Sequence, residues 1–197
     1  DPKANNLKRL IFLLTHRPEL KYIIEKITKR KKYQSIKETL NQEFKNDQFK
    51  GEVINIEHHL AHLSSCFHVS PFNEACVLSV DGFGDFASSA WGYGKNNDIE
   101  IDKKIHFPHS LGIFYQSITQ FLGFKNYGDE YKIMGLAPYG KPKYLNKLRK
   151  ILILKSNGKF ELNLKYFKFH KSNFNYTWNS GIVSIDDLYS NEMEILL

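Results

Sequence analysis

Cysteine is scarce in this chain of 197 residues, and no apolar run approaches the roughly 20 residues that span a bilayer. Two cysteines, Cys66 and Cys76, cannot build the disulfide framework of a small secreted domain. They predict a reducing, cytoplasmic setting in which both side chains fill the core. The chain begins without a methionine or a signal-peptide pattern, so we expect an excised piece of a longer protein that has no membrane partner.

The composition has no strong bias, and the positive charge is concentrated near the start of the chain. Hydrophobic residues make up 42% and charged residues 25%, which is typical of a globular protein that buries a core. Residues 1–50 hold 13 Lys or Arg against 6 Asp or Glu, whereas residues 51–197 hold 15 of each. The densest run, Lys29–Lys32, has the charge to contact nucleic acid, but such a run is more often a solvated turn. We therefore expect no nucleic-acid partner.

Two amphipathic helices are predicted within this basic segment. Apolar residues at helical spacing from Leu20 to Ile27 follow Pro18, which suits the first turn of a helix. Ser35 and Glu38 have the spacing of a capping box that opens a second helix. Residues 1–50 are thus expected to form a basic helical segment packed on a domain of residues 51–197.

From Gly51 onward the pattern predicts an α/β domain in which short strands and helices alternate. The glycine-containing stretch Gly94–Asp98 favours a hairpin turn between two of the strands. Strands are expected at 53–56, 75–80, 87–93 and 99–107, helices at 59–68, 110–122 and 143–154, and extended structure at 160–169.

Three histidines in Glu57–His62 and a following aspartate predict a metal site. His58 and His62 are four residues apart, so a helix places both imidazoles on one face. Asp81 follows an apolar run that reads as a buried strand, at the end where open α/β sheets meet ligands. Two imidazoles and a carboxylate leave coordination positions open, as in catalytic metal sites. His59 lies on a different helical face from His58, although its three-residue spacing also allows a pair with His62, and histidines on helices are commonly surface residues or hydrogen-bonded ones.

Asp81–Asp85 has the sequence Asp-Gly-Phe-Gly-Asp and predicts an anion-binding turn. Gly82 and Gly84 permit a sharp turn and let backbone N–H groups approach an anionic cofactor. Asp85 has the position to hydrogen-bond a metal ligand or to contact a metal through water. The motif is weak by itself, because Asp-Gly turns are common in hairpins.

The irregular stretch Gly128–Gly140, with three glycines, a proline and mixed charges, is typical of a binding loop. Glu130 has the chemistry to orient a hydroxyl nucleophile or a ribose. Lys132 has the charge to neutralise a phosphate or carbamate oxygen. A simple ion pair between Glu130 and a neighbouring lysine explains the same residues.

Five segments, in this order, resemble the family of O-carbamoyltransferases found in nodulation-factor and antibiotic biosynthesis. The resemblance is carried by Glu57–His62, Ser70–Ala75, Asp81–Asp85, Pro108–Gly112 and Glu130–Gly140. Several long motifs in the same order make a chance match improbable.

The resemblance implies part of an actin-like ATPase (ribonuclease H-like) fold, related to the hydrogenase-maturation carbamoyltransferase and the tRNA threonylcarbamoyl transferase. In that family a divalent metal, usually iron, lies beside a nucleotide, and His58, His62 and Asp81 match its ligands. A separate domain makes carbamoyl adenylate from carbamoyl phosphate and ATP, and the actin-like domain passes the carbamoyl group to a substrate hydroxyl. Glu130 and Lys132 are then candidates for positioning the substrate or the adenylate.

The chain departs from the family pattern in three ways. It lacks the N-terminal glycine-rich phosphate loop, the second actin-like half with a further aspartate ligand, and the adenylate-forming domain. We therefore expect an inactive fragment whose partners are those missing parts of the same parent chain. Two other hypotheses remain open, namely an actin-like ATP-dependent kinase or chaperone-like protein, and a noncatalytic interaction domain.

Overall fold

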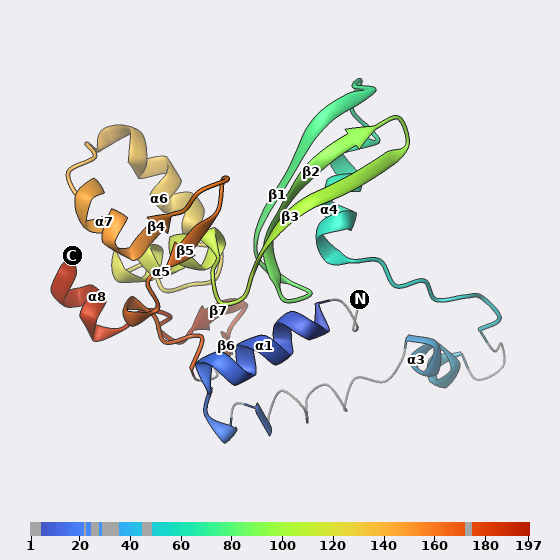
Figure 1. Ribbon diagram of the computed structural model, residues 1–197. Helices are drawn as coiled ribbons and strands as arrows, with labels where there is room; N and C mark the ends of the chain where they lie inside the picture. Colours follow the sequence, from blue (N-terminus) through green and yellow to red (C-terminus); the bar gives the residue numbers. More distant parts are fainter. Residues whose placement is uncertain (1–4, 22, 25–27, 29–35, 45–48, 172–174) are drawn as a thin grey trace.

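The structure is a computed structural model that describes residues 5–21, 23–24, 28, 36–44, 49–171 and 175–197 (Figure 1). It has a mixed α/β architecture whose described strands all pair antiparallel. The helices are α1 (Asn6–His16), α3 (Ile36–Glu43), α4 (His58–Phe67), α5 (Leu111–Phe121), α6 (Glu130–Leu136), α7 (Leu145–Ile151), α8 (Asn191–Leu196) and the 3-10 turns η1 (Ala137–Tyr139) and η2 (Leu164–Tyr166). The strands are β1 (Glu74–Gly84), β2 (Ala87–Lys95), β3 (Asp98–His106), β4 (Leu152–Leu154), β5 (Phe160–Leu162), β6 (Tyr176–Asn179) and β7 (Ile182–Ile185).

A three-stranded meander in the order β1-β2-β3 forms the main sheet. The turn between β1 and β2 is made by Asp85 and Phe86, which have positive φ angles of 49° and 71°. Asn96, with φ 55°, lies in the turn between β2 and β3. Two positive φ angles in a two-residue loop match the right-handed twist of a hairpin. The predicted hairpin at Gly94–Asp98 is confirmed, and so are the predicted strands at 75–80, 87–93 and 99–107.

Helix α4 covers one face of this meander and forms a small core with it (Figure 1). Leu63, Phe67 and Val77 are at most 5% exposed in this core. The alternation of side chains along a strand sends the next residues to the opposite face, where Leu78 is 65% and Val80 50% exposed. The prediction of a fully buried strand was therefore wrong, because in this chain only one face of β1 is covered.

The two cysteines also contradict the expectation from composition. Cys66 on α4 and Cys76 on β1 are free and exposed rather than part of the core. Cys66 points away from the sheet-facing side of its helix, and Cys76 lies on the uncovered face of β1. Their positions follow from the helical and strand periods, which place Leu63, Phe67 and Val77 inward instead.

A second and larger core packs α5 against the C-terminal part of the chain. It contains Ile113, Ile151, Leu162, Phe167, Phe169, Ile185, Leu188, Tyr189 and Met193. The predicted helix at 143–154 is shorter than expected, because α7 ends at Ile151 and Leu152–Leu154 pairs with β5 instead. Extended structure within 160–169 is confirmed only for β5, after which the chain forms the turn η2. The predicted helix at 110–122 is confirmed as α5.

The N-terminal segment is helical in the described residues, as predicted, but it contains a helix that the sequence patterns missed. Helix α1 buries Phe12 against the rings of Phe86 and Phe107. Leu20, Ile23 and Ile24 are helical, whereas Ile27, Lys29–Lys32 and the predicted cap Ser35 lie outside the described residues. Helix α3 confirms the second predicted helix and buries none of its residues.

The strand expected at 53–56 is absent, and its residues are exposed with no regular structure. Ile54 is 73% and Ile56 59% exposed. An apolar run becomes a strand only where another strand offers its backbone groups, and none does so here among the described residues. In the same described part of the chain, every helix is too short or too polar to cross a bilayer.

Candidate metal centre

The first turns of α4 hold two of the predicted ligands in place. Glu57 caps the helix, because its Oε2 accepts a hydrogen bond of 2.8 Å from the Leu60 N–H, and its Oε1 pairs with Lys104 Nζ at 3.0 Å. Burial raises the pKa of Glu57, but the hydrogen bonds from Leu60 and Lys104 outweigh it and leave the pKa below its usual value. The carboxylate therefore stays ionised and secures the helix end that carries His58 and His62.

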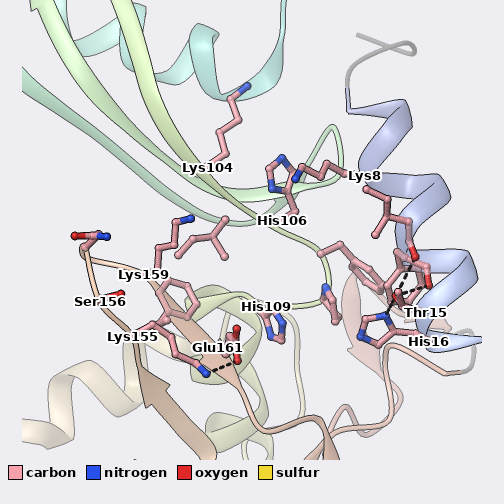
Figure 2. Close-up of a pocket in the computed structure, with 17 residues that line it drawn as sticks. Lys8, Thr15, His16, Lys104, His106, His109, Lys155, Ser156, Lys159 and Glu161 are labelled. Carbon is pink, nitrogen blue, oxygen red and sulfur yellow. Dashed lines mark hydrogen bonds and ion pairs between the residues drawn. The ribbon is translucent and has the colours of Figure 1, made fainter.

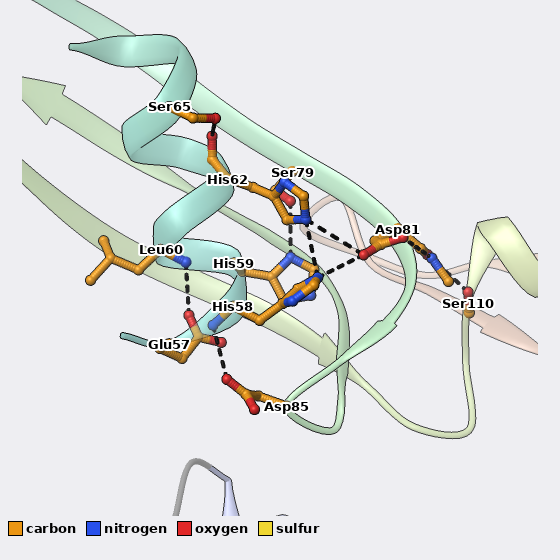
Figure 3. A network of polar contacts seen from close by, with 11 residues as sticks. Glu57, His58, His59, Leu60, His62, Ser65, Ser79, Asp81, Asp85 and Ser110 are labelled. Carbon is orange, nitrogen blue, oxygen red and sulfur yellow. Dashed lines mark hydrogen bonds and ion pairs between the residues drawn. The ribbon is translucent and has the colours of Figure 1, made fainter. Parts of the chain in front are cut away.

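The structure brings His58, His62 and Asp81 together at one point (Figure 3). His58 Nε2 lies 2.7 Å from Asp81 Oδ2, and His62 Nε2 lies 3.1 Å from His58 Nε2. The remaining distance, from His62 Nε2 to Asp81 Oδ2, is 3.6 Å. Two ligand atoms about 2.1 Å from a shared metal ion are separated by about 3.0–3.4 Å at right-angle to tetrahedral geometry. The 3.1 Å separation falls within this range and the 2.7 Å and 3.6 Å separations lie just outside it, so small side-chain shifts would give the three atoms the spacing of ligands around one ion.

Asp81 lies in an irregularity of β1 that turns its carboxylate toward α4. Regular pairing with β2 stops at Val80 and resumes at Gly84, so Asp81 lies in the shifted stretch between them. Its Oδ1 accepts a hydrogen bond of 2.6 Å from the Gly82 N–H, and its backbone carbonyl accepts one of 3.0 Å from Ser110 Oγ. The predicted position after the end of a regular strand is correct, although the sheet is antiparallel rather than the open parallel kind.

The ionisation of Asp81 is favoured by its neighbours. Partial burial raises the pKa of the carboxyl group. Hydrogen bonds from His58 and the Gly82 backbone, together with the charges of His58 and His62, lower the pKa by more than burial raises it. The net pKa lies below the usual value for aspartate. An ionised carboxylate beside two imidazoles is the state that binds a cation.

The Asp81–Asp85 turn supports His58, and only part of it is open to a ligand. A Cβ atom on Gly84 would overlap the imidazole ring of His58, so only glycine fits there. Asp85 Oδ2 accepts a hydrogen bond of 2.9 Å from the His58 N–H. Gly82 differs, since nothing lies within 4 Å of a Cβ built on it. A role in cofactor binding for Gly82, Gly84 and Asp85 stays a prediction, and the open space lies at Gly82.

His59 is separate from the three converging groups. Its side chain is fully buried, and its Nδ1 lies 2.9 Å from Ser79 Oγ on β1 (Figure 3). Burial is the main cause of the lowered pKa of His59, which keeps its ring neutral. His59 therefore joins α4 to β1 behind the ligands, as expected for a residue on another face of the helix.

Glu130 and Lys132 do not meet the metal ligands in this chain. Both lie on α6, which is separated from α4 by α5 and the sheet in Figure 1, and α5 contacts both β1 and α6. Lys132 Nζ pairs with Asp129 Oδ1 at 2.7 Å, and this contact raises the pKa of the lysine. The expected alternative of an ion pair is thus correct in kind, but its carboxylate is Asp129 rather than Glu130.

Sequence patterns missed four residues that position the site. Glu57 and Ser110 both precede apolar helices in the sequence, and this was a usable signal for capping residues. Ser79 and Lys104 lie on strands and meet α4 only through the fold, so no local pattern marks them. All four act by holding the ligand-bearing elements.

These features define a mixed α/β protein with a two-histidine, one-carboxylate centre at the junction of a helix and a hairpin. The sequence model of the family described as Carbamoyltransferase N-terminus matches residues 19–189. The chain belongs to this family.

Individual relatives are similar over about half of the chain. An uncharacterized protein of Synechocystis sp. is 48% identical over 114 residues, which are 57% of this chain and 18% of that protein. Nodulation protein NolNO of Sinorhizobium fredii is 38% identical over 103 residues, 52% of this chain and 15% of its own. Nodulation protein NolO of Bradyrhizobium diazoefficiens is 37% identical over 112 residues, which are 55% of this chain and 20% of that protein. The chain thus spans a fifth or less of these relatives.

Proposed function

We propose that the parent of this chain transfers a carbamoyl group from carbamoyl adenylate to a hydroxyl of a sugar-like or natural-product acceptor. The adenylate would be made from carbamoyl phosphate and ATP by another domain of the parent. The convergence of His58, His62 and Asp81, in a chain of the carbamoyltransferase family, is the observation that carries the proposal.

The three converging groups fit a divalent metal, and iron suits them best. Two imidazoles and one carboxylate on one side of an ion form the facial donor set that proteins use for Fe(II), with positions left open. His62 is 51% and Asp81 38% exposed, so the open side faces solvent in this chain. When bound, the metal would supply Lewis-acid polarisation of a carbonyl or phosphate oxygen.

The residues of the chain itself supply orientation. Asp85 and the Glu57–Lys104 pair hold the start of α4, which keeps the His58 imidazole turned toward Asp81. Ser110 holds the Asp81 backbone from α5, and the Gly82 N–H holds its carboxylate. Groups fixed in this way need little reorganisation when charge develops on a substrate.

The wider site lies in parts of the parent that the chain does not contain. We propose an actin-like fold in which residues 1–50 are a basic helical segment and residues 51–197 part of the domain. The missing second half and the adenylate-forming domain would complete the nucleotide pocket and bring Glu130 and Lys132 to the substrate or adenylate. The exposed face of β1, with Leu78 and Val80, supports further structure against this sheet. A cytoplasmic location stays a prediction.

The test is an assay of the full-length parent with carbamoyl phosphate, ATP and a panel of hydroxylated sugars. We expect carbamate esters in the products by mass spectrometry, and loss of about 100-fold or more in rate in the His58→Ala and His62→Ala variants. His68→Ala, an exposed histidine just after α4, is the matched control and should retain full activity. Sugar phosphates without bound metal would instead favour a kinase, and unchanged function in both variants an interaction domain.

A further inference from the structure

A second concave site, with none of the three metal ligands in its lining, lies between α1, the end of β3 and the β4–β5 loop (Figure 2). Its volume is about 450 Å³, which is the size of a pocket for a small molecule. Its floor includes Phe12, Ile105 and Phe160, each less than 10% exposed. The loop of residues 155–159 is closed by backbone hydrogen bonds, 2.9 Å from the Lys155 N–H to the Lys159 carbonyl, so this wall is well defined.

Cationic side chains from all three elements line the pocket. They are Lys8 from α1, Lys104 from β3, and Lys155 and Lys159 from the β4–β5 loop. Glu161 is the carboxylate of this lining, and it pairs with Lys155 at 2.9 Å. Lys104 pairs with Glu57 outside the pocket. Lys8 and Lys159 have no carboxylate partner among the described residues, so the pocket has an excess of positive charge.

His106 lies at the pocket wall, where burial and the neighbouring lysines both act on it. Burial, followed by the charges of Lys8 and Lys104, lowers the pKa of His106 to about 4, and the carboxylate of Glu57 does not offset them. Figure 2 shows the end of Lys8 beside His106, and Lys159 on the opposite wall. An anion placed between these walls would relieve the repulsion among the cations.

We propose that this pocket binds the phosphate group of a small phosphorylated metabolite, with Lys8 and Lys159 as the contacting cations. A phosphate group offers several strong acceptors, so ammonium groups on two walls of one pocket can bind it together. Nucleic acid instead needs a basic stripe along a surface, whereas these cations surround a bounded hollow. Helix α1 precedes residues 19–189, so one wall of the pocket lies outside the part of the chain that the family model matches.

Calorimetric titration of the chain with ribose 5-phosphate tests the proposal, with ribose as the phosphate-free control. EDTA in all solutions removes binding through a metal, so the result does not depend on the proposed metal centre. We expect binding of ribose 5-phosphate but not of ribose. The double variant Lys8→Gln/Lys159→Gln should weaken it by about tenfold or more, because it removes both charge-assisted contacts to the phosphate. Lys37→Gln/Lys171→Gln, with the same charge change at exposed sites, should bind as the unmodified chain does.

Four outcomes would overturn the proposal. The first is unchanged affinity in Lys8→Gln/Lys159→Gln, and the second is an equal loss in the control, which would mean a general effect of net charge. The third is loss of binding in His58→Ala/His62→Ala alone, since it would place the phosphate at the metal cluster. The fourth is tighter binding of a single-stranded oligonucleotide than of ribose 5-phosphate, weakened by the same lysine changes. Circular dichroism of each variant ensures that the folded chain is compared.

Discussion

At the scale of single residues, the candidate metal centre depends on atoms that are absent as much as on those present. His58 occupies the space where any side chain at position 84 would begin, so Gly84 determines where this imidazole lies. Asp85, next in the chain, then accepts the backbone N–H of the same histidine. A motif that suggests phosphate binding when read from sequence thus also holds a candidate metal ligand.

Replacing Gly84 with alanine should displace His58 and weaken metal binding by about tenfold or more, because an ion loses affinity when one ligand is misplaced. Gly84 does not have a positive φ, so the change adds no backbone strain. Co²⁺ affinity of the parent protein, followed by visible absorption, measures the effect.

Gly82→Ala is the matched control, since a methyl group there meets nothing within 4 Å. It should leave Co²⁺ affinity within about twofold of the unmodified protein, as surface changes away from such contacts usually do. Equal affinities for the two alanine variants would contradict the role assigned to Gly84.

At the scale of elements, the N-terminus of α5 is the support of the strand irregularity that carries Asp81. Ser110 is fully buried; its Oγ accepts a 3.1 Å hydrogen bond from the Ile113 N–H and donates a 3.0 Å hydrogen bond to the Asp81 carbonyl. Gly112 lets the helix approach, because a Cβ there would lie 2.8 Å from the Gly82 nitrogen. The cap of α5 and the candidate ligand Asp81 are therefore coupled through the Ser110 hydroxyl.

Ser110→Ala should lower the free energy of unfolding by about 1–3 kcal/mol, since it removes a helix cap and leaves the partly buried Asp81 carbonyl without this donor. Urea unfolding of the chain measures this loss. Ser65→Ala, on the exposed side of α4, removes a hydroxyl bound only to its own helix carbonyl and should cost no more than about 0.5 kcal/mol. A loss at Ser110 no larger than that at Ser65 would show that α5 does not support β1 in this way.

At the scale of the whole molecule, we propose that the chain supplies one side of a larger site. Its matches cover a fifth or less of the relatives' length, and the described strand β1 has an uncovered apolar face. All three converging side chains are more than a third exposed, His58 at 36%, Asp81 at 38% and His62 at 51%. A ligand set of this kind binds metal tightly only when further donors and a dry surrounding complete it.

We therefore expect the 197-residue chain to bind Fe(II) weakly and the full-length parent to bind it at least about tenfold more tightly. Anaerobic titration of both proteins, read by competition with a chromogenic chelator, compares them. Tight, stoichiometric binding of iron to the chain alone would contradict this expectation and would mean that His58, His62 and Asp81 suffice.

Local sequence patterns predicted those helices and turns that are specified by residues within the same segment. The helical spacing of His58 and His62, the hairpin turn at Gly94–Asp98 and the helix at 110–122 were all predicted correctly. The strand at 53–56 was wrong, because strand formation needs a partner that local sequence does not show. Helix α1 was missed, since its burial rests on Phe86 and Phe107 far along the chain.

The sequence by itself determined the family, the candidate ligands and most of the helices and strands near them, because these follow from residue type and spacing. Only the tertiary structure decided that β1 carries Asp81 in an irregular stretch, that Gly84 makes room for His58, and that Lys8 and Lys159 face one pocket. The physical reason is that each of these depends on contacts between segments distant in sequence. Their distances and steric limits exist only after α1, α4, α5 and the sheet have packed together.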